Sequence, residues 1–282
     1  MNGRALVLGG GGVTGIAWEL GVLAAVARHG VDLLDADLVL GTSAGAAVAA
    51  QATAGVRLGE LLDAQRTPPH ESAELQPDLD LDLLVHIFTL LHDEAVDEQQ
   101  RLMSVGALAL EADTVAEEVR RAVIEARLPS HDWPDSHLEI TAVDARTGEL
   151  VRFDRTSGVA LVDAVAASCA VPGVWPAVTI DDRRFIDGGM RSPTNADLAA
   201  GHDVVVVLSP LDPVGTPRLG QEVDRLRSDG SIVVEVQADR DALEAIGPNP
   251  LDVTRRAIAL DAGLRQGAIE AGRLAAVWLS WR

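Results

Sequence analysis

The sequence predicts an α/β fold with a mostly parallel central sheet. Short apolar runs alternate with helical patterns over residues 1–54, and glycine-rich turns separate the two kinds of segment. Uninterrupted apolar runs return at 204–208 and 232–236. Strands that alternate with helices usually pair in parallel, and a strand buried on both faces reads as a continuous apolar run. These runs are therefore expected to be strands of one sheet.

The first part of the chain supplies most of this alternation. Residues 5–8 predict a short buried strand, and four glycines follow it directly. Residues 16–28 repeat apolar side chains every three or four positions, which is the pattern of one helix face. A second apolar run at 37–40 then leads through a tight turn into a small-residue helix at 44–54.

The middle of the chain, roughly residues 59–130, predicts helices and no strand. An apolar run at 79–91 and a charge-laced amphipathic pattern at 115–128 both fit helices. We expect this helical insertion to lie over one edge of the sheet. It would serve either as a lid that shapes a substrate pocket or as plain scaffold.

Strand patterns return after the insertion, and the chain ends in a helical pattern. The predicted strands are 138–143, 150–153, 178–180 and 184–186, with a small-residue helix at 161–169 and a helical tail at 251–278. No internal repeat or linker interrupts the chain. We therefore expect a single domain over residues 1–282.

Composition restricts the classes of function. The chain has 43 acidic and 23 basic residues, a formal net charge of -20, and one cysteine, Cys169. Such a surface repels nucleic-acid phosphates and anionic lipid headgroups, so we expect no nucleic-acid partner. The start lacks a signal-peptide pattern, and no apolar run reaches the roughly 20 residues of a membrane span. We expect a cytoplasmic protein.

Ser43 lies where the predicted strand at 37–40 turns into the following helix. Gly41 and Gly45 flank it, which is the pattern of a nucleophile elbow, a sharp turn that presents a serine hydroxyl above the sheet edge. The alternative is an ordinary serine that caps the helix. The glycines at 9–12 follow the neighbouring strand and would lie at the same edge, where their N–H groups could stabilise an oxyanion. The N–H of Ala44 is a further candidate donor.

Asp187 is the candidate base. It ends the predicted strand at 184–186, and Gly188 and Gly189 after it allow a sharp turn and a close approach by another segment. Among the histidines, only His202 follows Asp187, and it precedes the strand at 204–208. It would therefore lie at the opposite edge of the sheet, so a histidine-containing triad is disfavoured. Asp187 alone would also be explained by an ordinary Asp-Gly turn.

The same glycines satisfy a dinucleotide-binding pattern through Gly10, Gly12 and Gly15. An acid near the expected distance would be Asp32, Asp35 or Asp37. A nucleotide-binding protein is therefore the main alternative, although it leaves Ser43 and the turn after Asp187 without a role.

The combination of these segments resembles the patatin-like phospholipase family. The matching segments are 9–15 (GGGGVTG), 41–45 (GTSAG) and 187–189 (DGG). Residues 167–168 and 171–173 are similar to the family's segment before the catalytic aspartate, and the resemblance runs through roughly Asn195. Two positions depart from the family pattern. Thr14 stands where the family often has Arg or Lys, and Pro193 precedes Asn195 where an Asn-Pro pair often follows the Asp-Gly-Gly.

The resemblance implies a three-layer α/β/α sandwich and a Ser-Asp dyad without histidine. It implies Ser43 as nucleophile, Asp187 as base, and Gly10, Gly11 and Gly12 as oxyanion donors. The implied reaction is hydrolysis of acyl esters, usually of lipids, through an acyl-serine. A catalytically weak member that keeps the fold and binds lipid or a partner is a second alternative, to which Thr14 lends weight.

These inferences define the expected partners. The substrate would be an acyl ester or a lipid, and the apolar run at 79–91 is the best candidate for a transient contact with a membrane or lipid aggregate. No cofactor is expected. No metal site is expected either, because His86 and His92 are six residues apart, as are His131 and His137. Ligand pairs on a helix are typically one turn apart. The oligomeric state and the natural substrate are left open.

Overall fold

A twisted mixed sheet forms the centre of the computed structural model, which describes residues 3–77, 79–211 and 218–280. Its strands follow the order β5-β6-β3-β2-β1-β7-β8, and β4 also pairs with β3. Strands β3, β2, β1, β7 and β8 are parallel to one another, whereas β4, β5 and β6 run antiparallel to their neighbours. The strands are β1 Arg4–Leu8, β2 Leu38–Thr42, β3 Leu138–Asp144, β4 Leu150–Phe153, β5 Val178–Ile180, β6 Arg183–Asp187, β7 Val204–Ser209 and β8 Ile232–Gln237.

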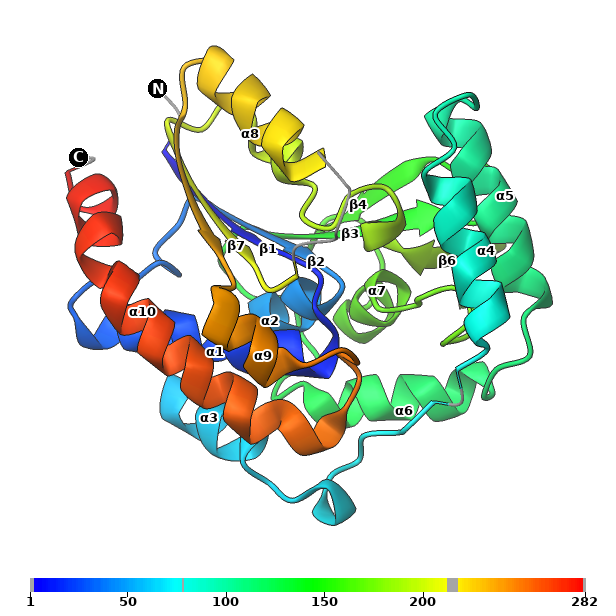
Figure 1. Cartoon of the computed structure of the whole chain (residues 1–282), viewed down its shortest axis with the longest axis horizontal. Helices are drawn as coiled ribbons and strands as arrows, with labels where there is room; N and C mark the ends of the chain where they lie inside the picture. Colours follow the sequence, from blue (N-terminus) through cyan, green and yellow to red (C-terminus); the bar gives the residue numbers. More distant parts are fainter. Residues whose placement is uncertain (1–2, 78, 212–217, 281–282) are drawn as a thin grey trace.

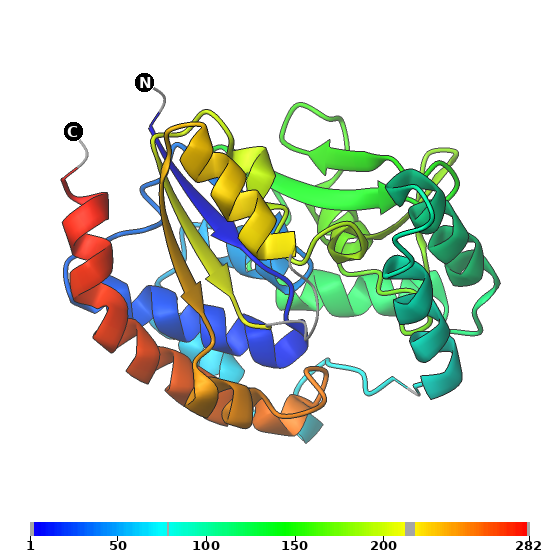
Figure 2. The same cartoon turned by 45° about the horizontal axis from the view of Figure 1, so that its top comes forward.

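Helices cover both faces of this sheet (Figures 1 and 2). One face carries α1, α2, α7 and α10, and the other carries α8. The helices are α1 Gly12–Arg28, α2 Ala44–Ala52, α3 Leu58–Gln65, α4 Leu81–Leu91, α5 Glu98–Glu111, α6 Glu117–Arg127, α7 Leu161–Ser168, α8 Arg218–Ser228, α9 Arg240–Ile246 and α10 Arg256–Trp278. The predicted three-layer α/β/α architecture with a mostly parallel sheet is confirmed.

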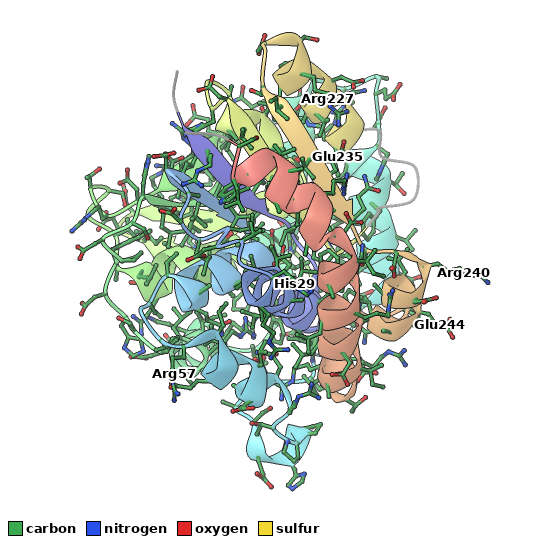
Figure 3. The ribbon with its side chains drawn as sticks, turned by 90° about the vertical axis from the view of Figure 1, so that its left-hand side faces the viewer. His29, Arg57, Arg227, Glu235, Arg240 and Glu244 are labelled. Atoms are coloured by element: carbon green, nitrogen blue, oxygen red, sulfur yellow. The ribbon has the colours of Figure 1, made fainter. Side chains whose placement is uncertain are left out.

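Alternation along β1 shows why two layers are required. Leu6 and Leu8 pack into the larger core with α1 and α10, whereas Ala5 and Val7 pack into the smaller core under α8. Because successive strand side chains point to opposite faces, an apolar run must be covered on both. At the edge of the second layer, Arg227 of α8 donates to Glu235 of β8 at 2.9 Å, and Figure 3 shows this pair.

The sequence led us to expect the helical insertion over one edge of the sheet. In the structure, only some of its helices lie there. Helices α4 and α5 pack on Val143 of β3 and Ile186 of β6, which is the expected position. In contrast, α3 packs against α1 and α10, and α6 packs against α7. The insertion therefore contributes to two separate parts of the molecule. Among the described helices, none combines the length and apolarity needed to cross a bilayer.

Candidate active site

The backbone at Ser43 has the strained geometry of a nucleophile elbow. Its φ of 55° and ψ of -116° lie in a region that residues other than glycine rarely adopt. A Cβ on Gly45 would collide with the carbonyl group of Leu8, and a Cβ on Gly41 would lie 2.6 Å from the Cα of Ala46. The Ser43 hydroxyl makes no capping hydrogen bond to α2. The turn therefore holds a half-buried hydroxyl that the helix does not use.

Two residues at the C-terminal end of α7 hold the backbone of Ser43. The Ser43 N–H donates to Ser168 Oγ at 2.8 Å, and the thiol of Cys169 lies 3.2 Å from the Ser43 carbonyl oxygen, to which it donates. Ser168 and Cys169 are both buried. These two contacts give Ser168 and Cys169 positioning roles that the sequence did not reveal, because the residues lie more than 100 positions from the elbow.

The glycine loop after β1 runs beside Ser43. A Cβ on Gly10 would lie 3.5 Å from the Cβ of Ser43. The N–H of Gly10 donates to the carbonyl oxygen of Pro193 at 2.8 Å, so this predicted oxyanion donor is already occupied. Within the described residues, the N–H groups of Gly11, Gly12 and Ala44 donate no hydrogen bond. Gly12 and Ala44 begin α1 and α2, so the positive ends of two helix dipoles lie at this edge of the sheet.

Asp187 ends β6 and is buried, with 1% of its surface exposed. Its N–H donates to the Ala170 carbonyl oxygen at 3.0 Å, and Oδ1 accepts from the Gly189 N–H at 2.7 Å. Gly188 is required here because a Cβ would lie 2.7 Å from the carbonyl oxygen of Thr141. Among the described residues, Oδ2 has no hydrogen-bond partner. One oxygen of the carboxyl group is thus held by the backbone, and the other accepts no hydrogen bond of ordinary geometry from the described residues.

Burial raises the pKa of Asp187 to about 7, although the Ser43 hydroxyl and the Gly189 N–H act in the opposite direction. The Ser43 hydroxyl is thus near enough to influence the carboxyl group. Nevertheless, no hydrogen bond of ordinary geometry joins the two side chains in the described structure. Catalytic hydrogen bonds are often long in the absence of substrate. With a pKa near neutrality, Asp187 can accept and return a proton at physiological pH.

Asn195 joins the loop after Asp187 to the serine elbow. It is buried in a left-handed conformation, with φ of 50°. Its Nδ2 lies within hydrogen-bonding distance of Thr42 Oγ1 at 3.1 Å and of the Gly188 carbonyl oxygen at 3.2 Å. Thr42 in turn contacts Thr141 through their hydroxyls at 2.9 Å. These bonds connect β2, which leads to Ser43, with β3 and with the turn after Asp187.

The profile of the patatin-like phospholipase family matches residues 6–200, more than half of the chain. The chain belongs to this family. Among solved structures, VipD from Legionella pneumophila is similar, with a TM-score of 0.46 and 13% identity over 97% of this chain and 67% of VipD. The type III effector protein ExoU is also similar, with a TM-score of 0.40 and 16% identity over 95% of this chain and 53% of ExoU. The chain therefore spans about half to two thirds of the length of these proteins.

A third structure holds full-length SpcU in complex with full-length ExoU from Pseudomonas aeruginosa. A chain of that complex gives a TM-score of 0.39 and 18% identity, over 98% of this chain and 58% of the matched chain.

Thr14, at the position where this patatin-like chain lacks a basic residue, is buried in a structural contact. Its N–H and its hydroxyl both donate to the carbonyl oxygen of Pro250, each at 3.1 Å. Thr14 therefore ties the start of α1 to the segment before α10. It contributes no charge to the predicted oxyanion site.

Glu19 is a buried carboxyl group behind the glycine loop. Its Oε1 accepts from the Gly9 N–H at 2.9 Å, and its Oε2 has no partner among the described residues. Burial raises the pKa of Glu19 well above its usual value, while the bond from Gly9 opposes this shift. Glu19 therefore supports the start of the glycine loop through the hydrogen bond that it accepts from Gly9.

Proposed function

We propose that this member of the patatin-like family is a serine acyl-ester hydrolase that acts on lipid esters through a Ser43–Asp187 dyad. The observation that carries the proposal is the buried Asp187, whose Oδ2 accepts no hydrogen bond from the described residues and whose pKa burial raises to about 7. The strained backbone at Ser43 also supports the proposal, because the Ser43 hydroxyl does not cap α2.

Acylation begins when Ser43 Oγ attacks the ester carbonyl carbon and its proton passes to Oδ2 of Asp187. The carbonyl π electrons move to oxygen, and the oxyanion would be stabilised by the N–H groups of Gly11, Gly12 and Ala44. Collapse of the tetrahedral intermediate breaks the bond to the leaving alcohol. That alcohol takes the proton from Asp187, which leaves an acyl-Ser43 ester and an ionised carboxylate.

Deacylation repeats these steps with water. Asp187 accepts a proton from the water molecule as its oxygen attacks the acyl-serine carbonyl carbon, and the same N–H groups hold the oxyanion. Collapse returns the proton to Ser43 Oγ and releases the carboxylic acid. One water is consumed, and both residues recover their starting states.

Helix α4 is the part of the chain that we propose to meet lipid. Leu81, Val85 and Phe88 are 67%, 67% and 58% exposed and recur every three or four positions, so they form one apolar stripe. We name Leu81, Val85 and Phe88 the α4 stripe. On the opposite side of the helix, Leu83 and Ile87 pack near Gly173. Gly173 lies in the loop that leads to β5 and β6. Lipid contact here would lie beside the segment that carries Asp187.

The nucleotide-binding alternative lacks a suitably placed acid. Asp32, Asp35 and Asp37 all precede β2, and Asp37 accepts from the Arg4 N–H at the start of β1. They therefore lie at the amino ends of the parallel strands, away from the glycine loop at the carboxyl ends. His202 also lies at the amino end, before β7, where its ring contacts the Ala199 carbonyl oxygen.

The test is hydrolysis of short and medium acyl p-nitrophenyl esters by the wild type, Ser43→Ala and Asp187→Asn. We expect kcat/KM to fall by about 10²-fold or more in each variant, since each removes a group required for proton transfer or attack. The matched controls are Ser228→Ala and Asp182→Asn, both at exposed positions, which should keep wild-type rates. Unchanged turnover in either dyad variant would exclude the proposed mechanism. Absence of turnover in every folded protein would favour a patatin-fold binding protein.

A further inference from the structure

A cavity of about 180 Å³ lies between the helices of the insertion and the first turns of α1. We name it the arginine pocket. Its lining includes Val13 and Ile16 of α1, Gln51 of α2, Glu74, Arg127 of α6 and Arg256 of α10. Neither Ser43 nor Asp187 lines it. It is therefore a site separate from the proposed dyad.

The cationic groups at this pocket outnumber the anionic ones. Arg127 forms a bidentate pair with Glu74, with Nε to Oε1 at 3.0 Å and Nη2 to Oε2 at 2.7 Å. Among the described residues, Arg256 forms no ion pair with a carboxylate. It donates from Nη2 to the Thr67 carbonyl oxygen at 2.9 Å, and its Nε is buried without a partner among the described residues. Arg256 is only 6% exposed and borders the cavity directly.

A third buried guanidinium group, that of Arg120, lies two turns earlier on α6. It stacks on the ring of Trp175 at 3.8 Å, and its Nε and Nη1 have no partner in the described part of the chain. Burial lowers the pKa of Arg120 to about 10, so the group stays charged at neutral pH. Burial alone would raise the pKa of Glu74, but Arg127, Arg120 and Arg256 together lower it. Within the described part of the chain, the charges of three arginines thus act on the one Glu74 carboxylate.

Such an arrangement is costly without a further anion. A buried charge that lacks a counter-charge destabilises a protein strongly, and buried cations are normally paired. The chain carries 43 acidic residues and a net charge of -20, so carboxylates are not scarce. Guanidinium groups bind the oxygen atoms of phosphates and carboxylates through charge-assisted hydrogen bonds. The excess of positive charge is therefore suited to an oxyanion from outside the chain.

The pocket also adjoins the proposed active site. Val13 directly follows Gly12, a candidate oxyanion donor, and it lines the cavity. Burial raises the pKa of the Cys169 thiol, whereas the charges of Arg127 and Arg120 oppose this shift, so these groups lie close together. The same thiol donates to the carbonyl oxygen of Ser43. An anion held by the arginines would lie behind the serine elbow.

We propose that the arginine pocket is a binding site for a small oxyanion, a phosphate or carboxylate group, carried by an amphiphile or free in solution. Arg256 supplies a guanidinium group that borders the cavity, Arg127 supplies the charge shared with Glu74, and Arg120, which does not line the cavity, adds positive charge nearby. The site does not require turnover at Ser43, so it can be tested independently of the hydrolase proposal.

The test measures the Tm of the full chain in the Ser43→Ala background, which prevents turnover. Inorganic phosphate at about 10 mM is compared with sodium chloride at the same ionic strength, because a ligand that binds only the folded state raises Tm. We expect phosphate to raise Tm by several degrees more than chloride. Arg256→Gln should weaken phosphate binding by about tenfold, the loss expected for one charge-assisted hydrogen bond.

Two further variants separate binding from folding. Arg57→Gln removes an exposed arginine and should keep the full phosphate effect. Arg256→Lys keeps the charge but not the planar donor pair, and should keep part of the effect. If the arginine is only structural, Arg256→Gln will lower Tm in chloride and leave the phosphate increment unchanged. That result, or a phosphate increment no larger than that of chloride in the parent protein, would overturn the proposal.

A second set of probes identifies the source of the oxyanion. Hexanoate is compared with hexanol, and a soluble short-chain lysophosphatidate with inorganic phosphate. If an amphiphile is the source, the protein should bind the anion that carries an acyl chain more tightly than inorganic phosphate. This difference in affinity should disappear in Arg256→Gln. A free anion as the source predicts equal affinities. No response to any of these anions would contradict the assignment.

Discussion

Asp187 determines the pH dependence that the proposed reaction should show. The carboxyl group is buried beside Ser43, and only its ionised form can accept the serine proton. With a pKa raised to about 7, most of the enzyme would be inactive below neutrality and active above it.

We therefore predict that kcat/KM for a soluble ester rises through a pH of about 7 and levels off above it. The measurement is a pH–rate profile with a short p-nitrophenyl ester, corrected for its spontaneous hydrolysis. A profile that is flat across this range, or one that falls with rising pH, would contradict the role of Asp187.

The same pKa predicts a pH-dependent cost in stability. Because the folded-state pKa is raised above the unfolded value of about 3.9, proton binding favours the folded state, and this contribution is lost as pH rises through about 7. Between pH of about 5.5 and 8, the wild type should lose about 2 kcal/mol of unfolding free energy relative to Asp187→Asn. Urea unfolding at the two pH values measures it. Asp182→Asn, in the exposed hairpin turn, should show no such trend, and an Asp187→Asn difference that stays constant would rule out a buried ionising group.

At this scale the sequence identified the residues of the proposed dyad but not the residues that support them. Ser43 and Asp187 lie in short motifs whose glycines are required by close backbone contacts, so local spacing reveals them. Ser168 and Asn195 act through contacts with residues more than 100 positions away. The occupied N–H of Gly10 depends on Pro193 in the same way. No local pattern encodes such contacts.

Among the described helices, α1 and α10 pack against each other most extensively. Glycines on both helices allow their backbones to approach closely. A Cβ on Gly21 of α1 would lie 2.8 Å from the Leu264 nitrogen, and a Cβ on Gly263 of α10 would meet the backbone of Trp18. Trp18 and Trp278, both fully buried, are anchored near this interface. The Trp18 ring donates to Gln266 of α10 at 3.1 Å.

We predict opposite effects for two alanine substitutions on α10. Gly263→Ala should destabilise the protein by about 1–3 kcal/mol because the added methyl group overpacks the interface. Gly272→Ala should stabilise it by about 0.5–1 kcal/mol, since nothing lies within 4 Å of the new Cβ and alanine is the better helix former. Chemical denaturation of both variants measures the two effects. Equal effects of the same sign would show that close packing does not decide the outcome.

The α4 stripe leads to a prediction about lipid aggregates. Val85→Glu combined with Phe88→Glu should lower activity on phospholipid vesicles at least about tenfold while leaving soluble-ester hydrolysis within about twofold, because charge opposes insertion into an interface. Ile269→Glu is a matched control, since Ile269 on α10 is 68% exposed. Parallel assays on the two substrates provide the comparison. Equal losses on both, or the same loss in the control, would remove α4 from the lipid-facing role.

Elements with a clear apolar pattern were predicted well, including the charge-rich helix α6, which the sequence placed at 115–128. Strand β4 and the apolar helix α4 lie where the sequence pattern indicated. Helices α8 and α9 were not singled out. In α8, only Glu222, Val223 and Leu226 are buried, so most of its sequence resembles a solvated loop.

At the scale of the molecule, sheet topology assembles the site. Parallel β1 and β2 place the glycine loop and Ser43 at the same edge. Antiparallel β6 pairs Asp187 with Ala142 of β3, and β3 in turn pairs with β2, so that Asp187 reaches the same place from a distant part of the chain. The sequence predicted the parallel part of this arrangement from alternation. It could not predict the antiparallel insertion of β6, because strand order depends on tertiary packing.

The most direct test of the Ser43–Asp187 dyad is the reaction of the folded protein with a fluorophosphonate, followed by peptide mass spectrometry. The dyad predicts a single adduct on the peptide containing Ser43 and none in Ser43→Ala. Labelling of Asp187→Asn should be slower by about 10²-fold or more, whereas Asp182→Asn should react like the wild type. An adduct on a different serine, or equal labelling rates for the wild type and Asp187→Asn, would contradict the dyad.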